Sequence, residues 1–221
     1  MKNLLVISAH PDDETLGAGG LISKYNSKGY NIFVLTISGH LPPLYTDKEY
    51  DTTIQEAKNA YKVLGVSDFK FLDIPATLVK DYPHSDLNMS ILSVIQKLQP
   101  EIVVFPFYDR HTDHRIVFDS TMVATRPIKD AKCIKLLAVY ETLSETHWNA
   151  PYIETNFMPN MIVDIDKYIE NKINASRCYT SQISEDQGPR SISSIKSLAH
   201  FRGSQSGFKY GEAYSVIRMI V

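Results

Sequence analysis

The amino-acid sequence predicts a Rossmann-like α/β fold, with a mostly parallel sheet and helices on both of its faces. Three observations support this fold class. Short apolar runs, typical of buried parallel strands, alternate with segments whose apolar residues recur at helical intervals. Several runs end in small or turn-forming residues, and 43% of the 221 residues are hydrophobic, enough for a sizeable core. We therefore interpret residues 1–221 as a single domain.

The first half of the chain shows the alternation most clearly. Strands rich in aliphatic and aromatic residues are expected at 4–7, 30–38, 69–74 and 101–107. Helices are expected at 15–28, 54–65, 85–99 and 113–126. The second helix ends on Gly65, and the last two stop at Pro100 and Pro127. Open α/β sheets of this kind form their sites at the carboxyl ends of the strands.

The second half of the chain is less regular. Strands are expected at 136–142 and 160–165, and helices at 166–183 and 191–207. The long aromatic segment 39–50 directly follows a predicted strand, so it fits either a substrate-facing lid or a plain surface connection.

Composition narrows the classes of partner and compartment. A formal net charge of -2 gives no broad basic field, so nucleic acid is not an expected partner. The N-terminal apolar run is too short to span a membrane and lacks a signal-peptide cleavage region, which predicts a cytoplasmic protein without a membrane partner. Cys133 and Cys178 form neither a disulfide framework nor a thiolate zinc cluster. The sequence leaves a homo-oligomer open.

The segment "AHPDDE", residues 9–14, places acidic residues where the first predicted strand ends. His10, Asp12 and Asp13 would lie in the crevice of an open α/β sheet. Because adjacent aspartates point in different directions, one can bind a cation while its neighbour handles a proton. The alternative is that Asp12, Asp13 and Glu14 only cap the following helix, whose N-terminus favours negative charge.

A second cluster, "DRHTDHR" at 109–115, follows the strand that ends at Phe107. Two histidines and a carboxylate with an open position form a common catalytic zinc site. His10, Asp13 and His114 would supply that set, and iron(II) can occupy similar ligands. The glycines of "LGAGG" do not match a dinucleotide-binding GxGxxG motif, because Ile22 occupies the third glycine position.

The two motifs together resemble the LmbE/PIG-L-like family of zinc-dependent N-deacetylases. The resemblance extends to "EAKNAYKVLG", to "SQI" at 181–183 and to the C-terminal "RGSQSGFKYGEAY", so it covers most of the chain. It implies hydrolysis of an acetamide, usually on an N-acetylhexosamine, and hence a small-molecule acetylated amino-sugar substrate.

Matching the motifs position by position implies individual roles. His10, Asp13 and His114 would bind zinc, and Asp12 would be the general base. His111 would stabilise the oxyanion or protonate the amine, and Asp113 would orient His111. Amide hydrolysis requires these parts, because the carbonyl must be polarised, water deprotonated and the leaving nitrogen protonated.

Two departures from the family pattern bear on the substrate. Thr112 replaces a proline that family members often carry in the second motif, and Thr53 replaces an arginine that often contacts substrate. Arg110 and Arg115 flank the second motif and could instead bind an anionic carrier such as a nucleotide diphosphate. His40, at a predicted strand end, is a third candidate substrate contact.

Two other functions stay open at this level. A metal-dependent esterase or phosphoesterase would use the same activation of water. A catalytically silent, metal-stabilised binding protein would need the ligands but not the unligated acid Asp12.

Overall fold

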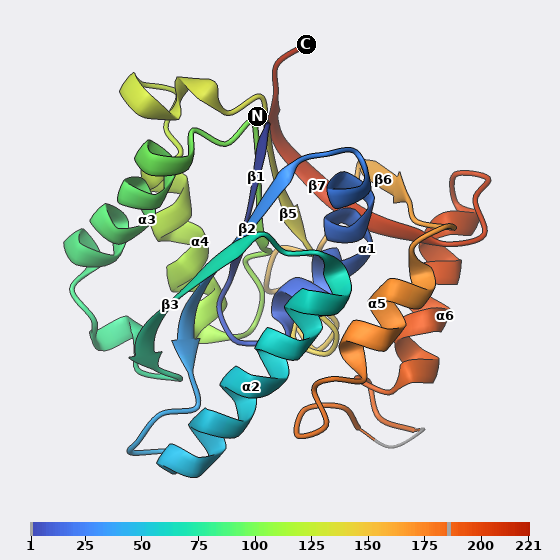
Figure 1. Cartoon of the computed structure of the whole chain (residues 1–221), viewed down its shortest axis with the longest axis horizontal. Coiled ribbons are helices and arrows are strands. Elements are labelled where there is room, and N and C mark those ends of the chain that lie inside the picture. Colours follow the sequence, from blue (N-terminus) through green and yellow to red (C-terminus); the bar gives the residue numbers. More distant parts are fainter. Residues whose placement is uncertain (1, 185–186) are drawn as a thin grey trace.

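Within the described residues, seven strands form one sheet in the order β3-β2-β1-β4-β5-β7-β6, seen nearly edge-on in Figure 1. The computed structural model describes residues 2–184 and 187–221. The strands are β1 (Asn3–Ser8), β2 (Asn31–Gly39), β3 (Asp68–Pro75), β4 (Ile102–Pro106), β5 (Leu136–Tyr140), β6 (Met161–Asp164) and β7 (Gly211–Met219). β1 to β5 run parallel, whereas β7 is antiparallel to β5 and to β6. The predicted mostly parallel sheet is confirmed.

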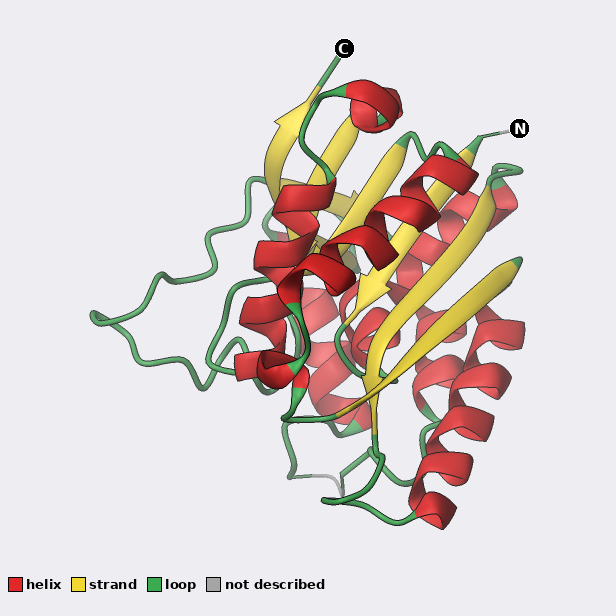
Figure 2. Cartoon of the chain, turned by 90° about the vertical axis from the view of Figure 1, so that its left-hand side faces the viewer, coloured by secondary structure: helices red, strands yellow, loops and turns green. Residues whose placement is uncertain are grey.

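Helices cover both faces of the sheet (Figure 1; Figure 2). One face carries α1 (Asp13–Ser27), α2 (Asp47–Leu64), α5 (Ile169–Ser176) and α6 (Ile192–Ser204). The other carries α3 (His84–Leu98) and α4 (Thr112–Ala124), with the 3-10 helices η1 (Val79–Asp81) and η2 (Lys129–Cys133) beside them. Leu5 and Ile7 of β1 face the second layer, and Leu4 and Val6 face the first, as strand alternation requires. Among the described residues, no helix combines the length and apolarity needed to cross a membrane.

The central strand β1 is the switch point of the sheet. β2 and β3 lie on one side of it, and β4 and β5 lie on the other. The connections that leave β1 and β4 therefore diverge and open a crevice between their carboxyl ends, where α/β proteins bind ligands. Both histidine-containing motifs follow these two strands.

One strand was not predicted, and two predicted helix boundaries need correction. β7 was not expected, because its sequence "GEAYSVIRM" mixes polar and apolar residues and its second half is only partly buried. The helix expected over 166–183 is shorter and ends at Ser176. α2 begins at Asp47, well before residue 54, because Thr46 and Glu49 form a reciprocal capping box.

Two glycines of "LGAGG" allow α1 to lie directly on the sheet. A side chain at Gly17 would overlap the ring of Tyr140, and one at Gly20 would overlap Ile165. The small residues therefore serve close packing of the helix.

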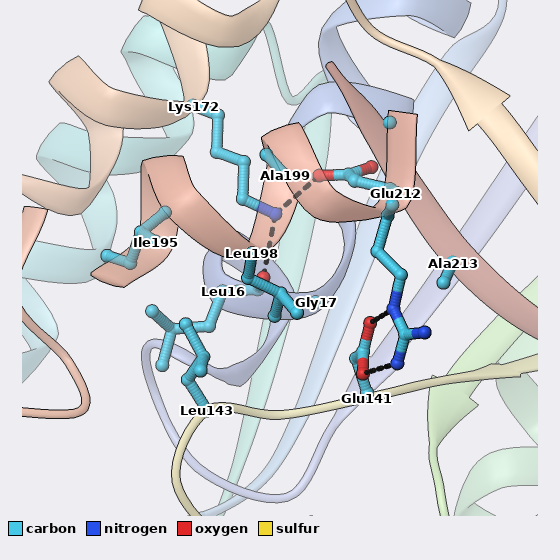
Figure 3. A pocket seen from close by; sticks show the side chains of 12 residues that line it. Leu16, Gly17, Glu141, Leu143, Lys172, Ile195, Leu198, Ala199, Glu212 and Ala213 are labelled. Atoms are coloured by element: carbon cyan, nitrogen blue, oxygen red, sulfur yellow. Dashed lines mark hydrogen bonds and ion pairs between the residues drawn. The ribbon is translucent and has the colours of Figure 1, made fainter. Parts of the chain in front are cut away.

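A buried ion pair joins α5 and β7 to the middle of α1 (Figure 3). Lys172 Nζ lies 2.6 Å from Glu212 Oε1 and donates to the Leu16 carbonyl at 2.7 Å. Glu212 accepts the backbone N–H groups of Gly20 and Leu21, each at 2.7 Å. Leu16 and Gly20 are four residues apart, the spacing of one α-helical hydrogen bond. The pair therefore contacts both ends of a turn of α1.

We predict that Lys172→Met lowers the free energy of unfolding by about 3–5 kcal/mol, because it leaves the Glu212 carboxylate buried without its cation. Urea denaturation followed by circular dichroism measures the change. The matched control is Lys196→Met, which removes an exposed pair with Glu170 (side chains 47% and 66% exposed) and is expected to cost less than about 1 kcal/mol. Equal losses in the two variants would show that the buried pair contributes nothing beyond a surface contact.

Candidate active site

A cavity of about 210 Å³ lies at the carboxyl edge of the sheet. Residues from the loops after all five parallel strands line it: His10, His40, Thr77, His111 and Glu145. Asp12 lines it as well, and Gln182 and Arg190 reach it from the segment between α5 and α6. The two motifs thus converge on one cavity, as their positions after β1 and β4 predict.

Asp12 stands at the N-terminus of α1 in an unusual backbone conformation, with φ 117° and ψ -31°. A non-glycine residue in such a region costs about 1–3 kcal/mol and persists only where its surroundings hold it. The Asp12 N–H donates to Glu14 Oε2 at 3.3 Å, and its carbonyl accepts the N–H groups of Thr15 and Leu16. The Asp12 side chain makes no capping hydrogen bond. Helix capping therefore does not explain this carboxylate.

Glu14 links Asp12 to the protein interior. It is fully buried, and its Oε1 accepts the hydroxyl of Tyr179 at 2.6 Å and that of Thr15 at 2.8 Å. Burial raises the pKa of Glu14, while these hydrogen bonds act in the opposite direction. The third acid of the motif is thus a buried hydrogen-bond acceptor beneath the site.

The two histidines His10 and His114 converge on the carboxylate of Asp13. Asp13 Oδ2 lies 3.4 Å from His10 Nδ1 and 3.3 Å from His114 Nε2. His114 Nε2 is buried and makes no hydrogen bond to any described residue. The ring nitrogens of His10, His111 and His114 also lie within 4.8 Å of one another. Imidazole nitrogens and a carboxylate oxygen are ligands that zinc accepts, so these residues fit a divalent metal.

In both His10 and His114, the second ring nitrogen contacts another carboxylate. His10 Nε2 pairs with Asp113 Oδ2 at 2.9 Å, and His114 Nδ1 pairs with Asp109 Oδ2 at 2.9 Å. Metal-binding histidines typically donate their second ring N–H in this way, which fixes the tautomer. Sequence reasoning missed Asp109, although its place two residues before His111 at a strand end was a usable signal.

Asp113 was expected to orient His111, and that role stays a prediction, but the contact of its carboxylate is with a different histidine. These residues are two positions apart at the start of α4, and such neighbours do not face each other on a helix. The carboxylate instead contacts His10 and accepts the N–H of Thr77 at 2.7 Å. Asp113 does hold His111, but through its backbone N–H, which donates to His111 Nδ1 at 3.2 Å.

This contact assigns a role to the His111 ring. Because Nδ1 accepts a hydrogen bond from a backbone amide, the neutral ring carries its proton on Nε2. Burial lowers the pKa of His111 to about 4, and positive charge on His10 and His114 acts in the same direction. Near pH 7 the ring is therefore a neutral hydrogen-bond donor.

The pKa values of His10 and Asp12 also differ from those of the free side chains. Burial lowers the pKa of His10, but hydrogen bonds to Asp113 and Asp13 outweigh it and raise the value to about 9. Burial raises the pKa of Asp12 to about 7, although the positive charge of Arg190 opposes the shift. A carboxyl group with this pKa can both accept and return a proton near neutral pH.

Arg190 is the cation that sequence reasoning missed. Its NH1 lies 3.0 Å from Asp12 Oδ2, and its NH2 lies 3.5 Å from Glu145 Oε1. No motif or spacing marks it, because the segment before α6 reaches the cavity only through tertiary packing.

The predicted substrate contacts divide into two outcomes. His40 lines the cavity, and its contact with substrate stays a prediction. Arg110 instead pairs with Glu145 at 2.5 Å, and Arg115 pairs with Glu154 at 3.1 Å. Neither arginine lines the cavity around Asp12. Their engagement with carboxylates removes the observation that favoured an anionic carrier.

Comparison with known proteins agrees with the family resemblance of the two motifs. A family model described as PIG-L, GlcNAc-PI de-N-acetylase, matches residues 5–125. A diacetylchitobiose deacetylase of Thermococcus kodakarensis is 28% identical over 232 residues, which cover 96% of this chain and 82% of the relative.

Two solved structures share the fold. The conserved protein TT1542 of Thermus thermophilus superposes with a TM-score of 0.80 at 22% identity, covering 100% of this chain and 97% of that one. A 4-carboxy-2-hydroxymuconate hydratase of Pseudomonas putida has a TM-score of 0.76 at 21% identity, covering 100% and 98%. At this identity the likeness shows the fold alone.

We predict that the protein binds one divalent metal per chain and that His114→Ala and Asp13→Asn lose most of it, because the first removes a ligand nitrogen and the second removes the negative charge of a ligand carboxylate. His111→Ala is expected to keep the metal, since its ring donates rather than ligates. Elemental analysis of protein purified without chelator measures the content, with the exposed His200→Ala as control. If His111→Ala loses metal as completely as His114→Ala, the three histidines form the ligand set instead.

Proposed function

The chain belongs to the PIG-L family, and on this premise we propose that it hydrolyses the acetamide of an N-acetylhexosamine-containing small molecule. The observation that carries the proposal is the Asp12 carboxylate, which is buried, held in a costly backbone conformation and paired with Arg190, whereas its neighbour Asp13 contacts the two histidines. The name of the Thermococcus kodakarensis relative, a diacetylchitobiose deacetylase, supports an amino-sugar substrate.

We assign a divalent metal, zinc in the first instance, to His10, Asp13 and His114, with iron(II) as the alternative. The buried Nε2 of His114, which lies 3.3 Å from Asp13 Oδ2 but makes no hydrogen bond to any described residue, supports this assignment. When bound, zinc would polarise the acetyl carbonyl and lower the pKa of water. Asp113 and Asp109 would keep the two histidines in the ligating tautomer.

The protein's own groups supply the remaining steps. Asp12 takes a proton from the attacking water and returns it to the departing amine nitrogen, which gives a free amine and acetic acid, and the acid then ionises to acetate in water. His111 Nε2–H donates to the oxygen that becomes negative as the carbonyl is attacked. Because the His111 ring is neutral near pH 7, we favour this role over protonation of the amine. Arg190 favours the ionised form of Asp12.

The competing functions fit less well. A silent binding protein gains nothing from a strained, unligated acid at Asp12. A phosphoesterase would need cations that are free to bind phosphate, whereas Arg110, Arg115 and Arg190 each contact a carboxylate. For the same reason we do not retain the nucleotide-linked carrier that the sequence suggested.

We predict that the metal-loaded protein releases acetate from N-acetylhexosamine compounds and that Asp12→Asn lowers kcat by about 10²–10⁴ while keeping the metal, since only the proton acceptor is lost. Enzymatic assay of acetate measures the rate, and elemental analysis measures the metal. Asp119→Asn, an exposed aspartate of α4, is the matched control. Near wild-type turnover by Asp12→Asn would remove Asp12 as the base.

A further inference from the structure

We propose that Thr146 is a positioning residue for the metal site, because its hydroxyl holds the Asp109 carboxylate and Asp109 in turn holds the ligand histidine His114. This inference rests on the metal assignment made with the proposed function, and it names a residue on which the affinity for that metal depends. Thr146 belongs to the loop after β5, residues 141–147, and no motif marks it. Three observations support its role: the donors that Asp109 accepts, the way the loop holds Thr146, and the burial of these contacts.

Asp109 is the point at which the contacts meet. Its Oδ2 lies 2.9 Å from His114 Nδ1 and accepts the Thr146 hydroxyl at 2.9 Å. Its Oδ1 accepts the backbone N–H of His111 at 2.9 Å. Because Nδ1 of His114 contacts Asp109, Nε2 is the ring nitrogen that faces Asp13, at 3.3 Å from its Oδ2. The orientation of the Asp109 carboxylate therefore sets the orientation of the His114 ring.

The hydrogen bonds of Thr146 direct its hydroxyl proton to Asp109. The hydroxyl oxygen accepts the backbone N–H of Thr142 at 2.9 Å, so its lone pairs are already used on that side. A carboxylate only accepts, and a threonine hydroxyl has one proton to donate. The Thr146 hydroxyl thus donates to Asp109, and a hydrogen bond to a charged acceptor is among the stronger kinds.

The loop fixes Thr146 in place. The Thr146 N–H donates to the Thr142 carbonyl at 3.0 Å, so backbone and side chain are both bound to the same residue. Glu141 anchors the two ends of the loop, because it accepts Arg202 Nε at 2.8 Å and NH2 at 2.6 Å and its Oε2 lies 3.1 Å from His147 Nε2. The hydroxyl is therefore held against Asp109 by the fold itself, which is how a site is preorganised.

These contacts are removed from solvent. Thr142, Asp109 and His114 are 0% exposed, and Thr146 is 7% exposed. Loss of a hydrogen bond at such a depth is not made good by bulk water. Without the hydroxyl, the Asp109 carboxylate keeps His114 but loses the donor that opposes its movement, so the ring is held less firmly.

The second ligand histidine has an equivalent arrangement. Asp113 contacts His10 Nε2 and accepts the backbone N–H of Thr77 from the loop after β3. The loops after β3 and β5 thus each supply one donor to the carboxylate behind one histidine. The donor on Asp113 is a backbone group, whereas the donor on Asp109 is the Thr146 side chain, which substitution can remove.

The test measures the zinc affinity of the full chain by competition with a chromophoric chelator. Thr146→Val should weaken zinc binding by about tenfold, the lower end of the effect of partners that orient metal ligands. Thr146→Ser keeps the hydroxyl and should keep the wild-type affinity. The matched control is Thr125→Val, which removes a buried hydroxyl that donates to the Thr121 carbonyl at 2.7 Å outside the site and should leave zinc affinity unchanged.

Thermal unfolding of the metal-free variants shows whether each one folds. Thr146→Ala removes the hydroxyl without placing a methyl group against Asp109, so it should match Thr146→Val in zinc affinity and replaces it if that variant does not fold. A double-mutant cycle then tests whether Thr146 acts through Asp109. Asp109→Asn should weaken zinc binding by itself, and adding Thr146→Val should weaken it little further, since the carboxylate that the hydroxyl holds is gone.

Three results would overturn this role of Thr146 and leave the proposed function standing: wild-type zinc affinity in Thr146→Val or Thr146→Ala, a loss in Thr146→Ser equal to theirs, or additive losses in the double variant. A wild-type chain that binds no zinc would overturn the metal assignment, and this inference with it.

Discussion

Five buried carboxyl groups around the carboxyl ends of β1 and β4 determine which segments of the chain must meet at the site. Asp12, Asp13, Glu14, Asp109 and Asp113 are each at most 3% exposed. An ionised carboxylate that leaves water without a partner is strongly destabilising, so each needs a donor or a cation. The partners come from five parts of the chain: the two histidine motifs, Thr77 after β3, Tyr179 after α5 and Arg190 before α6. The hydrogen bonds and ion pairs to these carboxyl groups therefore bring the parts of the site together.

Backbone geometry separates the two adjacent aspartates. Asp13 begins α1 and turns its carboxylate toward His10 and His114, whereas the positive φ of Asp12 turns its carboxylate toward Arg190. The two adjacent carboxylates therefore lie in different surroundings. The pKa of Asp12 is raised, whereas that of Asp13 is lowered. Separation of this kind lets one acid bind a cation while the other exchanges a proton.

Local sequence predicted those parts of the site that depend on strand ends. His10, Asp13 and His114 each follow a buried parallel strand closely, and the carboxyl ends of such strands meet at one edge, so their proximity could be foreseen. The pairing of Asp113 with His10 could not, because it depends on how α4 begins relative to the loop after β1. Arg190 and β7 were not predicted for a related reason. Their partners lie far away in the sequence, so the local sequence pattern does not indicate these contacts.

The place of β7 in the sheet has a consequence for synthesis of the chain on the ribosome. β7 supplies the last regular residues, Gly211–Met219, yet it lies between β5 and β6. Until it emerges, the edge of β5 is open, β6 has no neighbouring strand, and Lys172 lacks Glu212. A nascent chain with an open strand edge is prone to intermolecular pairing. The sheet is therefore completed only once β7 has been synthesised, and a chain that lacks residues 211–221 would be an aggregation-prone intermediate.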